Sequence, residues 1–173
     1  MHEFAEDPPV ERRVGDALRE HDGTVAVAET CTGGLVGALL TSVPGASDYL
    51  DRVVAPYDYD ALRTTLAVSR ETLDEHGAVS EPVARELARA ARDTADTTWG
   101  VATAGVAGPG GGTEEKPVGT GFVGVAYAAP WESGDSSATV SRYRFDGDRD
   151  AVRERLARQA LRDLETAVRD RTE

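Results

Sequence analysis

The chain has 173 residues, of which 40% are hydrophobic and only 6% aromatic. This length suffices for one domain that buries a single core without disulfides or metal ions. The net charge of -12 argues against duplex DNA as a direct partner, because such binding relies on clustered lysine and arginine. No apolar run reaches the roughly 20 residues that span a bilayer, and the N-terminus is acidic, so we expect a cytoplasmic protein without membrane contact.

Lys116 is the only lysine among the 19 basic residues, and all the others are arginine. An acidic surface that prefers arginine is typical of proteins from a concentrated-salt cytosol, where screening weakens self-repulsion. A GC-rich genome, which favours arginine, alanine and glycine codons, explains the same composition, and both explanations stay open. The single cysteine, Cys31, cannot form an internal disulfide, which agrees with a reducing compartment.

The first predicted elements are a lead-in, a helix and a strand. Residues 1–9 contain Pro8 and Pro9 and are expected to be disordered. Apolar residues at helical spacing predict a helix over 10–21. The apolar, partly β-branched run at 24–28 predicts a buried strand.

Polar residues and glycines follow this strand directly. The segment Glu29-Thr30-Cys31-Thr32-Gly33-Gly34 precedes a predicted helix over 35–40, which should end near Pro44 and Gly45. In an open α/β sheet, ligands favour the place where a strand ends and a helix begins. The sequence therefore predicts a ligand crevice near residues 29–34.

The middle of the chain predicts a strand over 52–55 and three helices. Two short helices are expected over 57–66 and 69–76, the second with Ser69 as its N-cap. A longer helix should run from Ser80 to about Thr94, because a capping serine, an early acid and an early proline are start signals.

The last part of the chain predicts three strands and a long helix. Strands are expected over 98–104, over 121–129, which is apolar on both faces, and over 138–145, which alternates like an edge strand. Apolar residues spaced by four predict a helix over 149–169. We therefore expect residues 10–171 to form a single α/β domain, a mixed sheet flanked by helices in a three-layer-like arrangement.

A glycine-rich loop, residues 105–112, follows the predicted strand 98–104. Backbone N–H groups that no side chain covers can form an anion-binding concavity, whereas a solvent-exposed hairpin connection has the same composition. Lys116 follows a glutamate and precedes a proline, so the loop does not match a nucleotide-triphosphate phosphate loop. A lysine retained beside this loop favours a functional role, with chance survival as the alternative.

Five stretches together resemble the C-terminal domain of the competence-damage-inducible protein CinA, in the same order. They lie at 28–34, 42–50, 75–88, 104–122 and 145–161, and the resemblance covers roughly residues 10–168. It implies a nicotinamide mononucleotide (NMN) deamidase, which hydrolyses the carboxamide of NMN to give nicotinic acid mononucleotide and ammonia. It implies no metal and no cofactor, and a homo-oligomer is compatible with it.

The chain departs from the family at both catalytic positions that the resemblance implies. The family's nucleophilic serine corresponds to Thr30, which keeps a hydroxyl but adds a methyl group that restricts χ1. The family's lysine base corresponds to Leu62, which cannot accept a proton. Two functions therefore stay open: an NMN amidohydrolase that works through Thr30, and a pyridine-nucleotide-binding or regulatory protein that has lost hydrolysis.

Other side chains near these positions have weaker claims to a catalytic role. Arg63 stays protonated and cannot act as a base. Lys116 could serve as the base if its loop folded over Thr30. Cys31 is an alternative nucleophile or a small buried residue. His76 fits a helix end better than a catalytic role.

The predicted binding residues belong to two glycine-containing loops and their neighbours. Tyr57 either stacks on the pyridine ring or belongs to the core, and Arg149 either contacts the ligand or lies on a solvated helix face. The full predicted set is Thr32, Gly33, Gly34, Tyr57, Gly105, Ala107, Gly108, Gly110, Lys116 and Arg149.

Overall fold

The computed structural model describes residues 3–171, and its elements follow the predicted order closely. The helices are α1 (Val10–Glu20), α2 (Leu35–Thr41), α3 (Tyr59–Leu66), α4 (Arg70–His76), α5 (Glu81–Ala95) and α6 (Arg149–Asp170), with a 3-10 turn η1 at Ala46–Asp48. The strands are β1 (Val25–Glu29), β2 (Leu50–Val54), β3 (Trp99–Gly105), β4 (Thr120–Tyr127) and β5 (Ser137–Arg144). The predicted elements are therefore confirmed, with ends that differ by a few residues.

The strands form one mixed sheet in the order β2-β1-β3-β4-β5. β1 pairs in parallel with β2 and with β3, while β3–β4 and β4–β5 are antiparallel. In this register Glu29, the last residue of β1, lies opposite Thr103 of β3, and β3 ends two residues later at Gly105, so the segments that follow the two strands leave the sheet at the same end. Residues 29–34, where the sequence predicts a ligand crevice, follow β1 at this end, where parallel strands finish.

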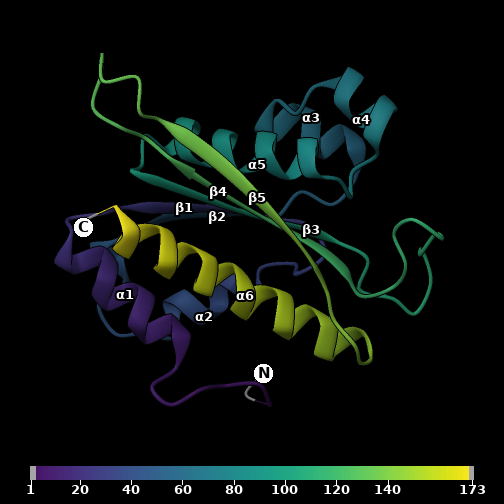
Figure 1. Cartoon of the computed structure of the whole chain (residues 1–173), viewed down its shortest axis with the longest axis horizontal. Coiled ribbons are helices and arrows are strands. Elements are labelled where there is room, and N and C mark those ends of the chain that lie inside the picture. The colour runs from purple at the N-terminus through teal and green to yellow at the C-terminus, as the bar shows by residue number, and fades with distance from the viewer. Residues whose placement is uncertain (1–2, 172–173) are drawn as a thin grey trace.

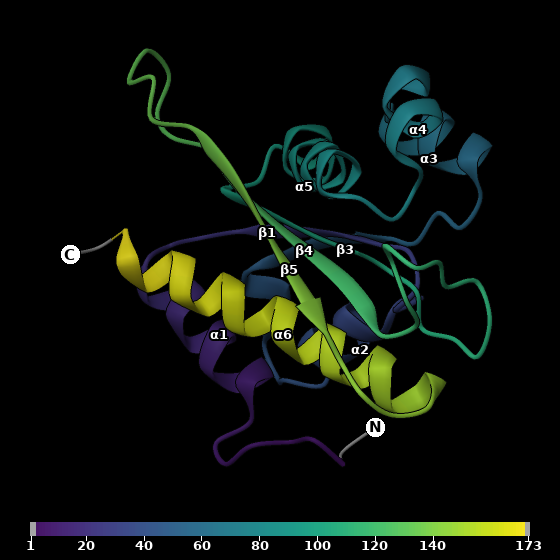
Figure 2. The same ribbon diagram turned by 45° about the vertical axis from the view of Figure 1, so that its right-hand side comes forward.

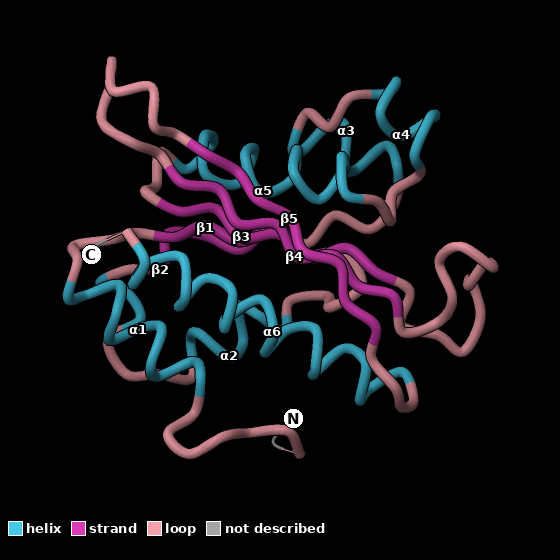
Figure 3. The backbone as a smooth tube through the Cα atoms, viewed as in Figure 1, coloured by secondary structure: helices cyan, strands magenta, loops and turns pink. Residues whose placement is uncertain are grey.

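Helices cover both faces of the sheet, as Figures 1 and 3 show. α1, α2 and α6 pack on one face and α3, α4 and α5 on the other. Alternation along β1 separates the two cores: Val25 and Val27 join the first core, and Ala26 and Ala28 join the second. The single-domain, three-layer α/β fold expected from the sequence is confirmed.

Small residues let α5 lie close to the sheet. A Cβ on Gly100 would stand 2.0 Å from the carbonyl oxygen of Ala88, and one on Gly124 would stand 2.5 Å from that of Ala84. Both distances are shorter than real Cβ contacts, so only glycine fits at these strand positions. Alanines and glycines in the sequence thus set the thickness of this layer.

Capping side chains begin the helices at the positions that local chemistry favours. Ser69 and Ser80 accept hydrogen bonds from the N–H groups of Thr72 and Val83, as predicted. Asp58 caps α3, which therefore begins at Tyr59 instead of Tyr57. Asp148 caps α6 in the same way, so that Arg149 is its first residue.

The first residues that the structure describes, 3–9, lie along α6. Residues 1–2, which belong to the predicted disordered lead-in, lie outside the described residues. Residues 3–9 form no helix or strand, and Glu6 makes ion pairs with Arg13 and Arg162. Within residues 3–171, none of the helices combines the length and the apolar character needed to cross a membrane.

Candidate active site

Thr30 is the first residue after β1, and its side chain is already hydrogen bonded. Its N–H and its Oγ1 both donate to the carbonyl oxygen of Thr103, at 3.1 and 3.0 Å. The parallel pairing of β1 with β3 produces this contact, because it places the ends of the two strands together. The hydroxyl of the candidate nucleophile is therefore held by a backbone acceptor, which cannot take its proton.

Glu29, which the sequence reasoning did not select, fixes the loop between Thr30 and α2. Its buried carboxylate accepts hydrogen bonds from the N–H groups of Gly34, Val36 and Gly37 at 3.0, 3.1 and 2.9 Å. These are donors that a helix start leaves without partners inside the helix. In the sequence, the signal for this role is a glutamate at the end of a buried strand, shortly before a pair of glycines.

Thr32 lies inside the protein. Its side chain is fully buried, and its Oγ1 is 2.7 Å from Oγ1 of Thr103, which is also fully buried. Gly33 and Gly34 follow with φ values of 60° and 92°, in the left-handed region that favours glycine. A Cβ on Gly34 would meet nothing within 4 Å, so this part of the loop faces open space.

The second glycine-containing loop begins beside the first. A Cβ on Gly105 would lie 3.1 Å from Sγ of Cys31 and 2.8 Å from the carbonyl oxygen of Thr120. Ala107 is buried in the first core, whereas a Cβ on Gly110 would meet nothing within 4 Å. Figure 2 shows that the loop projects from the end of the sheet where α6 begins. The two loops thus meet at Gly105 and Cys31.

Arg149 is hydrogen bonded to two of the other predicted residues. One of its terminal nitrogens, Nη1, donates to the carbonyl oxygen of Gly108, and the other, Nη2, donates to the hydroxyl of Tyr57 at 3.3 Å. Tyr57 is 70% exposed, so it is available to a ligand and does not belong to the core. The structure therefore brings Tyr57, Gly108 and Arg149 together at the start of α6.

Arg153 stands one helical turn after Arg149 and contacts the other loop. Its Nε donates to the carbonyl oxygen of Cys31 at 3.2 Å, and its Nη2 donates to that of Thr32 at 2.9 Å. Side chains four residues apart lie on the same side of a helix. The first turns of α6 therefore hold both loops, and the spacing of the two arginines was the signal that sequence reasoning passed over.

Lys116 does not donate to the glycine-rich segment of its own loop. Its Nζ donates to the carbonyl oxygen of His76, at the C-terminal end of α4, at 2.7 Å. A cation is favourable there because the last carbonyls of a helix carry partial negative charge. The only lysine of the chain thus connects the β3–β4 loop to the layer formed by α3, α4 and α5.

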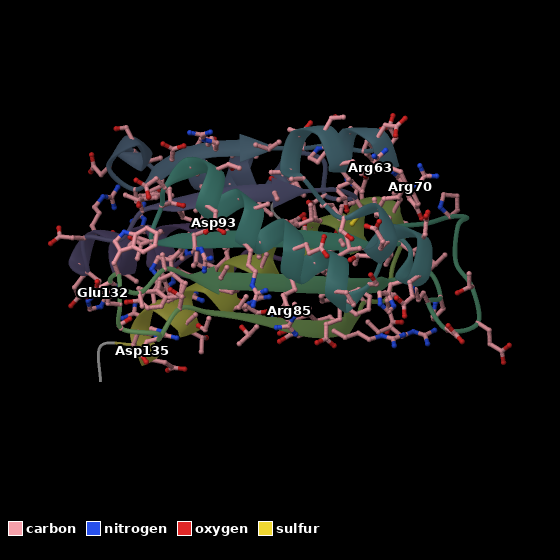
Figure 4. The ribbon with its side chains drawn as sticks, turned by 90° about the horizontal axis from the view of Figure 1, so that it is seen from above. Arg63, Arg70, Arg85, Asp93, Glu132 and Asp135 are labelled. Carbon is pink, nitrogen blue, oxygen red and sulfur yellow. The ribbon has the colours of Figure 1, made fainter. Side chains whose placement is uncertain are left out.

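Leu62, which stands at the position of the family's lysine, is 1% exposed. It packs in the second core together with Ala28, Leu66 and Leu87. Arg63 lies outside this core and pairs with Asp60 at 3.3 Å; Figure 4 labels it at the α3–α4 end of the molecule. No proton acceptor therefore replaces the lysine at this helical position.

Burial also decides the chemistry of Cys31. Cys31 is 8% exposed, and burial raises the pKa of its thiol to about 11. Because the thiolate is the nucleophile, the raised pKa disfavours Cys31 as the catalytic nucleophile near neutral pH. Over residues 3–171, no group of three or more histidine, cysteine, aspartate or glutamate side chains is placed to hold a metal ion.

The family model described as the CinA C-terminal domain matches residues 7–168. The chain is 53% identical over 145 residues to a CinA-like protein of Anaeromyxobacter sp. (strain K), covering 84% of this chain and 34% of that protein. It is 46% identical over 155 residues to a CinA-like protein of Salinibacter ruber, covering 90% and 36%. The chain thus spans about a third of the length of these curated relatives.

Solved structures agree with this assignment over nearly the whole chain. The competence/damage inducible protein CihA from Agrobacterium tumefaciens superposes with a TM-score of 0.84 at 34% identity, covering 92% of this chain and 93% of that one. The CinA superfamily protein KP700603 from Klebsiella pneumoniae gives 0.85 at 30% identity, covering 93% and 96%. The chain belongs to the CinA C-terminal domain family.

Proposed function

We propose that the chain binds NMN, or a closely similar pyridine mononucleotide, and hydrolyses its carboxamide slowly through Thr30. The single observation that carries this proposal is Arg149, which hydrogen bonds to both Gly108 and Tyr57, one helical turn before the Arg153 contacts with the loop that follows Thr30. A guanidinium, an exposed aromatic ring and an open glycine loop suit the phosphate, the pyridine and the ribose of such a ligand. Membership of the CinA family supports an amidase-like function at the level of the family.

The proposed reaction needs a nucleophile and an acceptor for its proton. Oγ1 of Thr30 attacks the carboxamide carbon and forms a tetrahedral intermediate, whose collapse breaks the C–N bond. The leaving nitrogen receives the proton lost by Thr30 and departs as ammonia, which leaves the acyl group as an ester on Thr30. Water then hydrolyses the ester on Thr30 and regenerates the hydroxyl. Since Leu62 provides no base, a water molecule has to accept the threonine proton, which makes the first step slow.

A second candidate function is nucleotide binding without turnover. Two observations favour it: the hydroxyl of Thr30 is directed to the carbonyl oxygen of Thr103, and Leu62 is part of the apolar core. Loss of one member of a nucleophile–base pair commonly lowers kcat by several orders of magnitude. Such a protein would keep the Arg149 side of the site and act as a sensor or carrier.

Ammonia release from NMN in concentrated salt separates the two functions. For the slow hydrolase, purified protein should release ammonia above the level of its Thr30→Ala variant, while both bind NMN equally in calorimetry. If the wild-type protein and the Thr30→Ala variant release ammonia equally, nucleotide binding without turnover is the function that remains. The binding measurement includes nicotinic acid mononucleotide and NAD as competing ligands. If the wild-type protein does not bind NMN, both functions are rejected.

A further inference from the structure

We infer that Arg153 is a positioning residue, which holds the Thr30–Gly34 loop in the arrangement that the candidate site needs. The inference rests on the proposed function only in that this loop is part of the nucleotide site. Its basis is the pair of hydrogen bonds from one guanidinium to two successive carbonyl oxygens, those of Cys31 and Thr32. A planar guanidinium with donors in a fixed fork is suited to such a double contact.

The loop needs an external support because its own backbone is permissive. Gly33 and Gly34 both have positive φ, and neither carries a side chain that would restrict the turn. The helix that follows, α2, has 7 residues, which is short for independent stability. The loop geometry must therefore come from contacts with the rest of the protein.

Thr30 and Thr32 are each tied to Thr103 of β3, and two further side chains hold the rest of the loop. The carboxylate of Glu29 binds N–H groups of Gly34, Val36 and Gly37, which fixes the start of α2. Arg153 binds carbonyl oxygens of the segment before it. Loss of Arg153 should leave α2 docked through Glu29 and release mainly Cys31 and Thr32, and with them the adjacent Thr30.

An ion pair with the nearby carboxylate of Asp150 does not explain the position of the Arg153 guanidinium. Asp150 is 3.5 Å from Nη1 of Arg153, and its side chain is 89% exposed. An ion pair exposed to this degree contributes little. Arg153 itself is 31% exposed, and a Cβ on Gly33 would stand 3.5 Å from its Nη2, so the guanidinium lies directly against the loop.

Cys31 provides a probe of this loop that requires no ligand. Cys31 lies between Thr30 and Thr32 and is buried, with 8% of the residue exposed, so opening of the loop should speed its alkylation. We expect Arg153→Gln to raise the rate of Cys31 alkylation by iodoacetamide at pH 8 about tenfold, which corresponds to the loss of a charge-assisted hydrogen bond. Arg153→Lys should restore part of the protection, because an ammonium can reach one carbonyl.

Arg89→Gln is the matched control, since Arg89 is exposed on α5, in the opposite layer. It should leave the alkylation rate at the wild-type value. An unchanged rate in Arg153→Gln would overturn the inference. Hydrogen exchange distinguishes opening of the loop from destabilisation of the whole protein by Arg153→Gln. Faster exchange at residues 30–34 with an unchanged exchange rate in α5 supports the inference. Equal acceleration in both segments overturns it.

Ligand measurements separate this inference from the proposed function. If wild-type protein binds no NMN, the proposed function fails, and alkylation and exchange still decide whether Arg153 holds the loop. If NMN is hydrolysed, Arg153→Gln should lower kcat more than it raises KM, since it misplaces Thr30. A change in KM alone would assign Arg153 to ligand binding and overturn the positioning role.

Discussion

Tyr57 and Arg149 are joined by a 3.3 Å hydrogen bond between their side chains, although 92 positions separate them in the chain. The same guanidinium donates to the carbonyl oxygen of Gly108. Arg149 therefore connects the segment before α3, the β3–β4 loop and the start of α6 in one place. This relationship makes Arg149 the residue on which ligand affinity should depend most.

Arg149→Gln should weaken NMN binding by about tenfold or more, because a charge-assisted contact with the ligand and the support of Tyr57 are lost together. Arg149→Lys should recover only part of the affinity, since an ammonium cannot reproduce the fork of a guanidinium. Isothermal titration calorimetry measures both. Arg63→Gln is the control, because Arg63 pairs with Asp60 outside the core and should not affect binding.

Gly105, at the end of β3, and Gly110, in the β3–β4 loop, should respond differently to alanine. Gly105→Ala places a methyl group 2.8 Å from the carbonyl oxygen of Thr120, which should cost about 1–3 kcal/mol of unfolding free energy. Gly110→Ala meets nothing within 4 Å and should leave stability unchanged or slightly higher. Denaturant unfolding gives both values. A loss at Gly110 equal to that at Gly105 would contradict this account of the loop.

Leu62→Lys combined with Thr30→Ser should raise NMN hydrolysis by roughly 100-fold or more, the usual contribution of a positioned base. Burial in the second core should lower the pKa of the new lysine, so that it is neutral part of the time near pH 7. Steady-state ammonia release measures the gain.

Leu66→Lys combined with Thr30→Ser is the matched control for this gain. Leu66 is 2% exposed and lies in the same core, one turn further along α3. Leu66→Lys therefore also buries a lysine in this core, at a similar cost in stability, but at a different position. Equal rates for the two double variants would show that the position of Leu62 has no special relation to Thr30.

Glu6→Gln should destabilise the protein at neutral pH and have no effect in acid. Hydrogen bonds from Arg13 and Arg162 lower the pKa of the Glu6 carboxyl below its ordinary value in the folded state. Its contribution is therefore present above the unfolded-state pKa and disappears as the pH falls through the lowered folded pKa. The side chain is 37% exposed, so screening limits the effect to about 1 kcal/mol. Thermal unfolding between pH 3 and 7 tests this.

Salt should stabilise the wild-type protein. The net charge of -12 repels itself in the folded state, and molar KCl reduces the screening length to about 3 Å. Figure 4 labels four charged side chains on the layer formed by α3, α4 and α5: Arg63 of α3, Arg70 of α4, and Arg85 and Asp93 of α5. We expect the unfolding midpoint to rise between 0.1 and 1 M KCl. A falling midpoint would favour codon usage over salt adaptation as the origin of the composition.

The local structure could be predicted from short stretches of sequence. Ser69 and Ser80 cap helices because their hydroxyls bind N–H groups only three residues away. The predicted strand 121–129 is apolar on both faces, which is typical of an interior strand, and β4 lies between β3 and β5. Tyr57 lies outside its predicted helix because Asp58, one residue later, provides the cap.

The site depended on contacts that no local pattern contains. Arg153 and Cys31 are 122 positions apart, and Lys116 and His76 are 40 apart. Periodicity and capping reach only a few residues along the chain, so they fix elements and their starts. Which loops meet depends on the pairing of β1 with β3 and on the way α6 crosses the sheet. Both arrangements result from packing the two cores at the same time. The sequence by itself determined the elements and their order, whereas packing alone decided that Thr30 faces a carbonyl and Leu62 faces the core.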